Sequence, residues 1–205
     1  MEGKNQNVLS VEDLSIRIKL DEGTLTPVRG VSFQIRQGET MGLVGESGCG
    51  KSLTSKAILG INTPNCKTTG KILFTEDGKT QDLLKLKFGG AEIRKIRGKD
   101  ISMIFQEPMT SFSPLFTVGS QIAESVRIHT GKKKKEAREI VVETMKKVGI
   151  SNPEKRFDQY PHEFSGGMLQ RALIAMALVC SPRLLIADEP TTALDVTIQA
   201  QILEL

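Results

Sequence analysis

Short apolar runs separated by turns occupy the first part of the chain. Residues 8–18 alternate loosely between apolar and polar positions and predict a strand, residues 28–35 predict a second strand, and Asp21-Glu22-Gly23 predicts the turn between them. Residues 40–44 form a short apolar run that enters a glycine-rich loop, so we predict a buried strand there. Residues 51–59 then predict a helix.

The rest of the chain alternates strands with longer helices. Residues 70–74 and 101–105 predict strands, and residues 118–127 and 135–148 have apolar positions at helical spacing. Residues 167–180 are apolar on almost every face, which predicts a buried helix. The other predicted segments are a loop between Pro153 and Pro161, a strand over 183–187 and the beginning of a helix over 193–205.

This order of elements predicts an α/β fold. Strands that alternate with helices in this way favour a mostly parallel sheet with helices packed on it. Residues 107–164 contain no convincing strand, so we interpret this block as a helical insertion. The lysines at 132–135 form the one charge run, which is typical of a solvated helix start.

Composition excludes several classes of protein. The 205 residues carry a formal net charge of +4, and the basic residues form no stripe with interleaved aromatics, so we expect no nucleic-acid partner. No apolar run reaches the ~18 residues that a membrane-spanning helix needs. The three cysteines have no metal-ligand spacing and favour a reducing compartment. These features favour a cytosolic globular protein.

A glycine-rich loop joins the predicted strand at 40–44 to the predicted helix at 51–59. Its glycines permit backbone angles that a Cβ would forbid, so successive N–H groups can point inward as an anion nest, and the helix start adds positive potential. Lys51 supplies a positive charge to the terminal phosphates, and the Ser52 hydroxyl is suited to Mg²⁺. A chance glycine turn is the alternative. The phosphate-loop pattern is matched without substitution by Gly45, Glu46, Ser47, Gly48, Cys49, Gly50, Lys51 and Ser52.

Two carboxylates follow the predicted strand at 183–187. Ligands collect beyond the carboxyl ends of parallel strands, so Asp188 and Glu189 can face the phosphate loop. We expect Asp188 to hold Mg²⁺ and Glu189 to act as general base, a role worth roughly 10²–10⁴ in rate. Alternatively the pair caps the next helix, with Pro190 in its first turn. Gln106 follows another predicted strand, where a neutral amide can reach both Mg²⁺ and water.

A second helix start with exposed N–H groups follows Phe164. Ser165 is a good N-cap, and Gly166 and Gly167 open the long apolar helix. Such a helix start is a second phosphate-binding surface. Two of these surfaces in one chain predict two nucleotides held between two chains, whereas the alternative is a simple capped turn.

In this order, the segments resemble the ABC ATPase family over essentially the whole chain. The Lys51 loop, the Gln106 loop and the Ser165-Gly166-Gly167 helix start correspond to the family's Walker A, Q-loop and signature. Its Walker B and D-loop correspond to Leu185-Ile186-Ala187-Asp188-Glu189-Pro190 and Ala193-Leu194-Asp195.

A narrower resemblance is to the oligopeptide, dipeptide and nickel importer branch of this family. It is carried by Phe105-Gln106-Glu107-Pro108, by Pro161-His162-Glu163-Phe164 with the signature after it, and by the stretch 187–197. Met168-Leu169-Gln170 looks somewhat like the nickel members.

The resemblance implies an ATPase that uses ATP and Mg²⁺. Catalytic roles fall on Glu189, Lys51 and Gln106, and magnesium would be held by Ser52, Gln106 and Asp188. Leu53 joins the residues around the nucleotide, and Ile18 takes the place of an aromatic that stacks on adenine, with a weaker contribution. Asp195 would link the two sites across a dimer interface, whereas His129 and His162 are read as structural or exposed.

The family also implies a division of the chain and a set of partners. The chain is read as one nucleotide-binding domain that is incomplete at its C-terminus, where the family's switch histidine would lie. Residues 1–106 and 165–205 form the P-loop NTPase core with N-terminal antiparallel strands, and about 107–164 form the helical subdomain. The implied partners are a second ABC ATPase subunit in a head-to-tail dimer, two transmembrane permeases and, indirectly, an extracellular or periplasmic solute-binding protein.

We therefore predict the ATP-hydrolysing subunit of an importer of peptides or nickel chelates, at the cytoplasmic face of a bacterial-type membrane. Residues 111–118 contain apolar side chains on a predicted loop, which suit either docking to a permease or local packing. The alternative functions are a non-transport ABC ATPase that acts in DNA repair or translation, and a nucleotide-binding fragment with little turnover.

Overall fold

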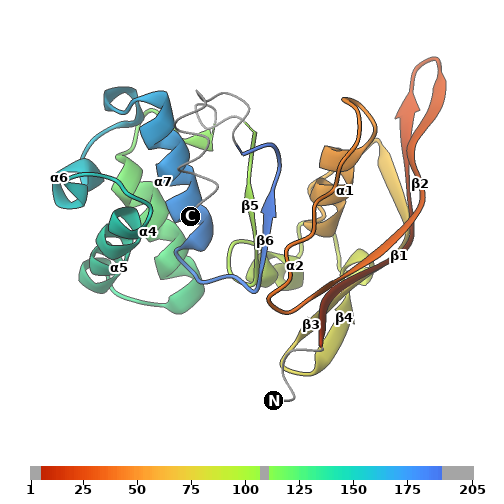
Figure 1. The fold of residues 1–205 in the computed structure, drawn as a ribbon, viewed down its shortest axis with the longest axis horizontal. Coiled ribbons are helices and arrows are strands. Elements are labelled where there is room, and N and C mark those ends of the chain that lie inside the picture. The colour runs from red at the N-terminus through yellow and green to blue at the C-terminus, as the bar shows by residue number, and fades with distance from the viewer. Residues whose placement is uncertain (1–5, 107–110, 191–205) are drawn as a thin grey trace. The chain divides into compact units, whose positions relative to one another are not determined.

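The computed structural model describes residues 6–106 and 111–190. The chain divides into two compact units, Met1–Arg97 and Gly98–Leu205, and each is described here by itself (Figure 1).

The first unit is built on a four-stranded antiparallel sheet with the strand order β2-β1-β3-β4. The strands are β1 (Asn7–Leu20), β2 (Gly23–Arg36), β3 (Cys66–Glu76) and β4 (Lys79–Asp82). The predicted strands at 8–18, 28–35 and 70–74 and the turn before Gly23 are confirmed, although the strands extend beyond the predicted ranges. β4 was not predicted, because its sequence Lys-Thr-Gln-Asp contains no apolar residue.

Alternating apolar residues of β1 form the core of this sheet. Leu9 and Val11, and beyond a register shift Leu14 and Ile16, are buried in pairs two residues apart, as the period of two along a half-buried strand requires. The pairing of β1 with β3 shifts register between Glu12 and Ser15, where Asp13 has φ 48°. A Cβ on Gly70 would lie 2.6 Å from the Glu12 and Asp13 carbonyl oxygens, so only glycine fits opposite this bulge.

Three short helices complete the first unit, namely α1 (Lys51–Ile58), η2 (Leu83–Lys85) and α2 (Ala91–Ile96). Arg97 joins α1 to α2, because its guanidinium donates hydrogen bonds of 2.6 Å to the carbonyl oxygens of Leu59 and Gly60. Burial lowers the pKa of Arg97 from its ordinary value. The helix predicted over 51–59 is confirmed.

The prediction of a buried strand over 40–44 is wrong. These residues are irregular, and Leu43 and Val44 are 43% and 93% exposed. An apolar run forms a buried strand only where a neighbouring strand pairs with its backbone. Among the described residues of the first unit, no strand pairs with this segment.

The second unit combines two parallel strands with a group of helices. β5 (Ile101–Ile104) pairs in parallel with β6 (Leu184–Ala187), as predicted for 101–105 and 183–187. The helices are α4 (Val118–Thr130), α5 (Lys134–Lys147), α6 (Pro153–Phe157), η3 (Pro161–Glu163) and α7 (Gly166–Leu178). The predicted helices at 118–127, 135–148 and 167–180 are confirmed.

The core of the second unit lies between α4, α5 and α7. Ile122, Met145 and Leu169 are completely buried in one continuous apolar cluster. Val141 is also buried and Ile140 is partly buried, which confirms the apolar face predicted for α5. The segment between Pro153 and Pro161 was wrongly predicted as a loop. It forms α6 and η3, because proline is compatible with the first turn of a helix, where its missing N–H has no helical partner.

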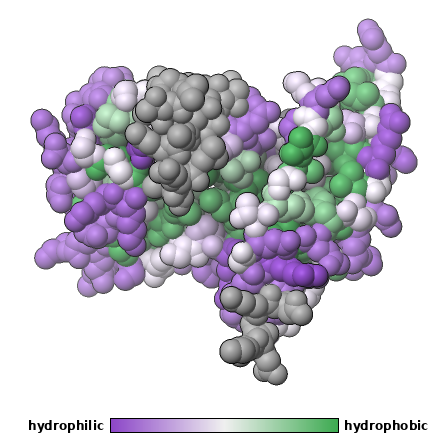
Figure 2. All heavy atoms as spheres, viewed as in Figure 1, coloured by the Kyte–Doolittle hydropathy of each residue, from purple (hydrophilic) through white to green (hydrophobic). Residues whose placement is uncertain are grey.

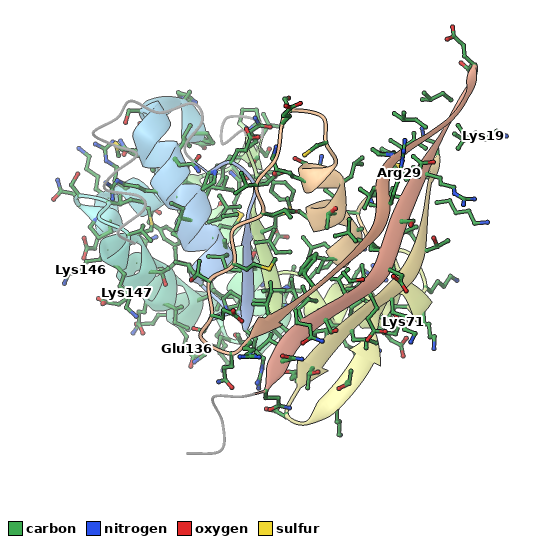
Figure 3. The ribbon with its side chains drawn as sticks, turned by 45° about the vertical axis from the view of Figure 1, so that its right-hand side comes forward. Lys19, Arg29, Lys71, Glu136, Lys146 and Lys147 are labelled. Carbon is green, nitrogen blue, oxygen red and sulfur yellow. The ribbon has the colours of Figure 1, made fainter. Side chains whose placement is uncertain are left out.

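Hydrophilic side chains cover the outer surface of α5 (Figure 2). Lys132, Lys133, Lys134 and Lys135 are exposed at its beginning, as predicted, and Lys146 and Lys147 project outward from its last turn (Figure 3). Lysines near a helix C-terminus interact favourably with the helix dipole. Within the described ranges, no helix has the length and apolar character needed to cross a bilayer.

Gly119 provides a test of packing between α4 and α6. A Cβ at this position would lie 2.2 Å from the Phe157 ring and 2.6 Å from its carbonyl oxygen. Gly119→Ala should therefore reduce the free energy of unfolding by about 1–3 kcal/mol, although alanine normally stabilises a helix relative to glycine. Denaturant unfolding measures the change. The control is Glu124→Ala on the exposed face of α4, for which a change within about 0.5 kcal/mol is expected. A more stable Gly119→Ala variant would contradict this packing.

Candidate nucleotide-binding site

The phosphate loop ends on α1 through two glycines in left-handed conformations. Gly48 and Gly50 have φ values of 80° and 98°, which side-chain-bearing residues rarely adopt. Gly50 is the N-cap of α1 and has no side chain to bond the N–H groups of the first turn. A helix start of this kind offers these groups and the positive end of the helix dipole to an anion.

Lys51 folds over the loop from the first position of α1. Its Nζ donates hydrogen bonds to the carbonyl oxygens of Gly45 and Glu46, at 2.7 and 2.9 Å. The ammonium group therefore lies against the phosphate loop, together with which it is predicted to bind the phosphates. Residues 45–49 are all exposed, including the Cys49 thiol, whereas Ser52 and Leu53 are half-buried in α1.

Ile18 lies on β1 in the same unit. It is half-buried and is paired across the sheet with Leu25 of β2 and with Cys66 of β3. The turn before β3 is tied to the neighbouring backbone, since the Lys19 N–H donates to the Asn65 carbonyl at 3.0 Å. The strand that carries Ile18 is thus held on both edges. Its contact with adenine stays a prediction.

In the second unit, the ends of the two parallel strands bring Gln106 and Glu189 together. The Gln106 amide donates a hydrogen bond of 2.8 Å to Oε2 of Glu189. Asp188 is only 8% exposed, and its N–H continues the ladder by donating to the Ile104 carbonyl at 3.0 Å. Residues from distant parts of the sequence therefore meet beyond the carboxyl ends of β5 and β6, as expected for a ligand site in a parallel sheet.

Glu189 has a left-handed backbone with φ 48°. For a residue with a Cβ this conformation costs about 1–2 kcal/mol. Such strain persists only where the surroundings hold it, and it is concentrated at functional sites. The turn directs the Glu189 carboxylate toward Gln106 immediately after β6 ends.

The start of α7 has the cap that was predicted. Ser165 is its N-cap, and its Oγ accepts a hydrogen bond from the Met168 N–H at 3.3 Å. Nothing lies within 4 Å of the position that a Cβ on Gly166 would take, so a ligand can approach this helix start closely. Gly167 continues the first turn. Asp195 lies outside the described residues.

A buried glutamine of α7 was missed as a functional candidate. Gln170 is 1% exposed, and its Nε2 donates a hydrogen bond of 2.6 Å to the carbonyl oxygen of Pro190. An unpaired buried amide would cost about 1–3 kcal/mol, so its partner matters. The available signal was a glutamine, followed by Arg171, within the otherwise apolar stretch 167–180.

The two histidines, which were predicted to be structural or exposed, differ in burial: His162 is exposed and His129 is partly buried. His162 stacks on Tyr160 with 5.7 Å between ring centroids. His129 packs against Gly98, and burial is the main cause that lowers its pKa, with Asp100 opposing the shift and Lys99 adding to it.

The predicted magnesium ligands fit the ion by their chemistry. Ser52, Gln106 and Asp188 offer a hydroxyl, an amide and a carboxylate oxygen, and Mg²⁺ prefers oxygen ligands, usually one or two carboxylates together with substrate phosphates. In residues 6–106 and 111–190, no three His, Cys, Asp or Glu side chains are grouped as a metal site. Ser52 belongs to the first unit and the other two ligands to the second. That they share one ion stays a prediction.

Comparison with known proteins decides the family. The family model described as "ABC transporter" matches residues 28–192. This chain belongs to the ABC transporter family. The resemblance inferred from the sequence motifs is thereby confirmed.

Several similar proteins are named as peptide transport proteins. The chain is 55% identical over 202 residues to "Dipeptide transport ATP-binding protein DppD" of Bacillus subtilis, and the aligned region covers 98% of this chain and 58% of that protein. It is 53% identical over 200 residues to "Oligopeptide transport ATP-binding protein OppD" of the same organism, and the aligned region covers 97% of this chain and 54% of that protein. The chain therefore spans little more than half the length of these relatives.

Solved structures of ABC cassettes have the same fold. The dimeric post-hydrolysis state of "the ATP-binding cassette MJ0796 bound to ADP and Pi" superposes with a TM-score of 0.81 at 25% identity, over 96% of this chain and 80% of that chain. CbiO1 of Clostridium perfringens, described as part of the cbiONQ transporter complex, gives a TM-score of 0.73 at 28% identity, over 98% and 72%. The predicted P-loop α/β fold is thus confirmed.

Two glycines of the ABC phosphate loop give a matched test of its geometry. Both Gly50→Ala and Gly48→Ala place a Cβ on a left-handed backbone. Only at Gly50 would that Cβ also lie 2.7 Å from Val28 Cγ2 and 3.2 Å from the Pro27 carbonyl. We expect Gly50→Ala to lower the unfolding free energy by about 1–3 kcal/mol more than Gly48→Ala. Thermal unfolding without nucleotide measures the difference, and equal losses would contradict the described contact.

Proposed function

We propose that this chain binds and hydrolyses ATP as a subunit of an ABC importer that takes up peptides. The observation that carries the proposal is the 2.8 Å contact between Gln106 and Glu189 at the carboxyl ends of two parallel strands. It holds a carboxylate beyond the carboxyl ends of two parallel strands, where ligands of such sheets collect, and this supports a general-base role for Glu189. The glycine loop with Lys51 supplies the complementary phosphate-binding element.

In the proposed mechanism, the loop amides and Lys51 bind the β- and γ-phosphates of ATP. Ser52, Asp188 and Gln106 would hold Mg²⁺, which neutralises charge on the phosphates when it is bound. Glu189 orients the attacking water and accepts its proton as the water oxygen bonds to the γ-phosphorus. The bond from the γ-phosphorus to the β-γ bridging oxygen breaks, and ADP and phosphate leave. The hydrogen bond from Gln106 holds the Glu189 carboxylate in one orientation.

The active unit is proposed to be a head-to-tail dimer with a second ABC ATPase subunit. ATP on the Lys51 loop of one subunit would meet the Ser165-Gly166-Gly167 helix start of the other. The capped and sterically open start of α7 supports this role, as does the similarity to a dimeric cassette structure. Ile18 would cover the adenine, and Asp195 would link the two sites. Residues 1–106 and 165–205 are proposed as the catalytic core and about 107–164 as the helical subdomain.

The loop at 111–118 is proposed to contact a permease. Leu115 and Phe116 are 78% and 60% exposed, whereas Phe112 and Val118 are buried in the local core. Local packing and docking to a permease, the two functions considered for this loop, would therefore fall on different residues. Phe112 and Val118 anchor the loop, and Leu115 and Phe116 present apolar surface. The proposed complex contains two permeases, is served by an external solute-binding protein and places this chain at the cytoplasmic face of the membrane.

Peptides are the proposed cargo because the similar proteins with a stated cargo are dipeptide and oligopeptide transport proteins. Uptake of nickel chelates is supported only by the likeness of Met168-Leu169-Gln170 to nickel members. Cargo selection belongs to the permeases and the solute-binding protein, so these subunits must be identified directly.

Two substitutions separate nucleotide binding from hydrolysis. Lys51→Ala removes the cation of the phosphate loop and should weaken ATP binding by about tenfold or more. Glu189→Gln keeps the side-chain shape but removes the base, so it should leave ATP binding within about threefold and reduce kcat by roughly 10²–10⁴. Isothermal titration and phosphate release measure the two effects in the full gene product.

Matched controls for these substitutions lie on the exposed face of α5. Lys146→Ala and Glu143→Gln make the same changes of charge away from the site and should leave both ATP binding and kcat unchanged. Unchanged hydrolysis in both Lys51→Ala and Glu189→Gln would contradict the assignment of the site.

The transport function is tested by purifying the tagged full gene product from its native membrane in mild detergent. We expect two permease subunits and a second ABC ATPase to co-purify, and peptides with their binding protein to stimulate ATP turnover after reconstitution. Stimulation by nickel chelates alone, and not by peptides, would identify nickel chelates as the cargo. A stable complex with ribosomes or DNA, without permeases, would contradict an importer.

A further inference from the structure

Gln170 is a polar side chain buried within an apolar helix. It lies in the second turn of α7 and is 1% exposed, and its neighbours Leu169 and Ala172 are completely buried. Buried amides are almost always hydrogen bonded. Here the partner is not in the same helix but in the turn after β6, where the Pro190 carbonyl accepts from Nε2 at 2.6 Å.

The turn that Gln170 reaches is the one that carries Glu189. The backbone before this turn is held by the Asp188 N–H, which is bonded to β5, and the Glu189 carboxylate is held by Gln106. The left-handed φ of Glu189 places a sharp change of direction between these contacts and Pro190. The Gln170 bond is therefore the described contact that holds the C-terminal side of the turn. Loss of this bond removes a restraint on Pro190, the residue directly after Glu189, and so loosens the turn that carries the carboxylate.

We propose that Gln170 is a positioning residue for ATP hydrolysis: its amide fixes the Pro190 carbonyl, and through it the orientation of Glu189, relative to the helix start at Ser165. This inference rests on the proposed function. The start of α7 would face the nucleotide of the second subunit, whereas Glu189 would act on the nucleotide of its own subunit. One hydrogen bond from Gln170 would thus connect, within one chain, the helix start that faces the partner's nucleotide with the carboxylate that acts on the chain's own nucleotide.

The link has the properties that coupling between two sites needs. A side chain in the second turn of a helix moves with the start of that helix, and a hydrogen bond of 2.6 Å transmits displacement directly to the bonded carbonyl. By this link, a nucleotide bound at the Ser165 helix start would affect the position of Glu189 in the same chain. Coupling of this kind is measured as a free energy shared by two sites.

The decisive variant is Gln170→Met in the full gene product. Methionine has a similar length and volume and fills the apolar environment, but it cannot donate to the Pro190 carbonyl. We expect kcat to fall by about ten- to a hundredfold, as for other losses of precise orientation, while KM for ATP changes by less than about threefold. Hydrogen–deuterium exchange of the segment 184–190 should become faster in the nucleotide-free variant.

A second variant, Gln170→Glu, tests the donor itself. The ionised carboxylate has the shape of the amide but no proton to donate, whereas the protonated acid can donate to Pro190. Burial raises the pKa of a carboxyl group, so the ratio of variant to unaltered kcat should increase as pH is lowered. A purely steric role for Gln170 predicts a ratio that does not depend on pH.

The control for stability is Val141→Ala, which removes completely buried side-chain volume from α5 and does not touch the Glu189 turn. It should lower Tm but retain kcat and the exchange rate of 184–190. The proposal is overturned if Gln170→Met keeps the unaltered kcat and exchange, or if Val141→Ala loses kcat to the same extent at an equal fall in Tm. Failure of the unaltered protein to bind ATP would contradict the proposed function instead, and the exchange comparison would still decide whether Gln170 holds the turn.

Discussion

The concentrated negative charge of a triphosphate is the constraint that a nucleotide site in this chain must satisfy. No single side chain can neutralise it, so a binding site must bring a nest of N–H groups, a cation and metal-binding oxygens to one small volume. The chain has these parts on separate elements. Gly48 and Gly50 turn the backbone into α1, Lys51 folds over the loop, and the ends of β5 and β6 present Gln106 and Glu189 side by side.

Features governed by local backbone chemistry could be predicted from the sequence. Left-handed glycines, the N-cap at Ser165 and the alternation along β1 depend on residues close in the chain, and all three are confirmed. β4 was missed because its four residues are polar and owe their strand to pairing with β3. The prediction of a strand at 40–44 was wrong for the opposite reason. The segment is apolar, but burial requires a strand partner that no described residue of its unit provides.

The chemistry of the carboxylate end could be predicted only in part. Asp188 and Glu189 were found because two acids directly follow an apolar strand. The strained backbone of Glu189 and its contact with Gln106 depend on parallel pairing between strands that are far apart in the sequence. Gln170 was missed for the same reason, since a glutamine in an apolar helix does not reveal which distant carbonyl it reaches. Sequence patterns thus identify functional side chains more readily than the bonds that orient them.

We propose that one metal ion on ATP is held by both Ser52 and Asp188, which belong to different units of the chain. Mn²⁺ in place of Mg²⁺ tests it directly, because its affinity for the protein–ATP complex is measurable by electron paramagnetic resonance in a Glu189→Gln background. We expect Ser52→Ala and Asp188→Asn each to weaken Mn²⁺ binding by about tenfold or more, and the double variant to lose less than the product of the two effects. Full Mn²⁺ affinity in Asp188→Asn, beside a loss in Ser52→Ala, would contradict a metal ion shared by the two residues.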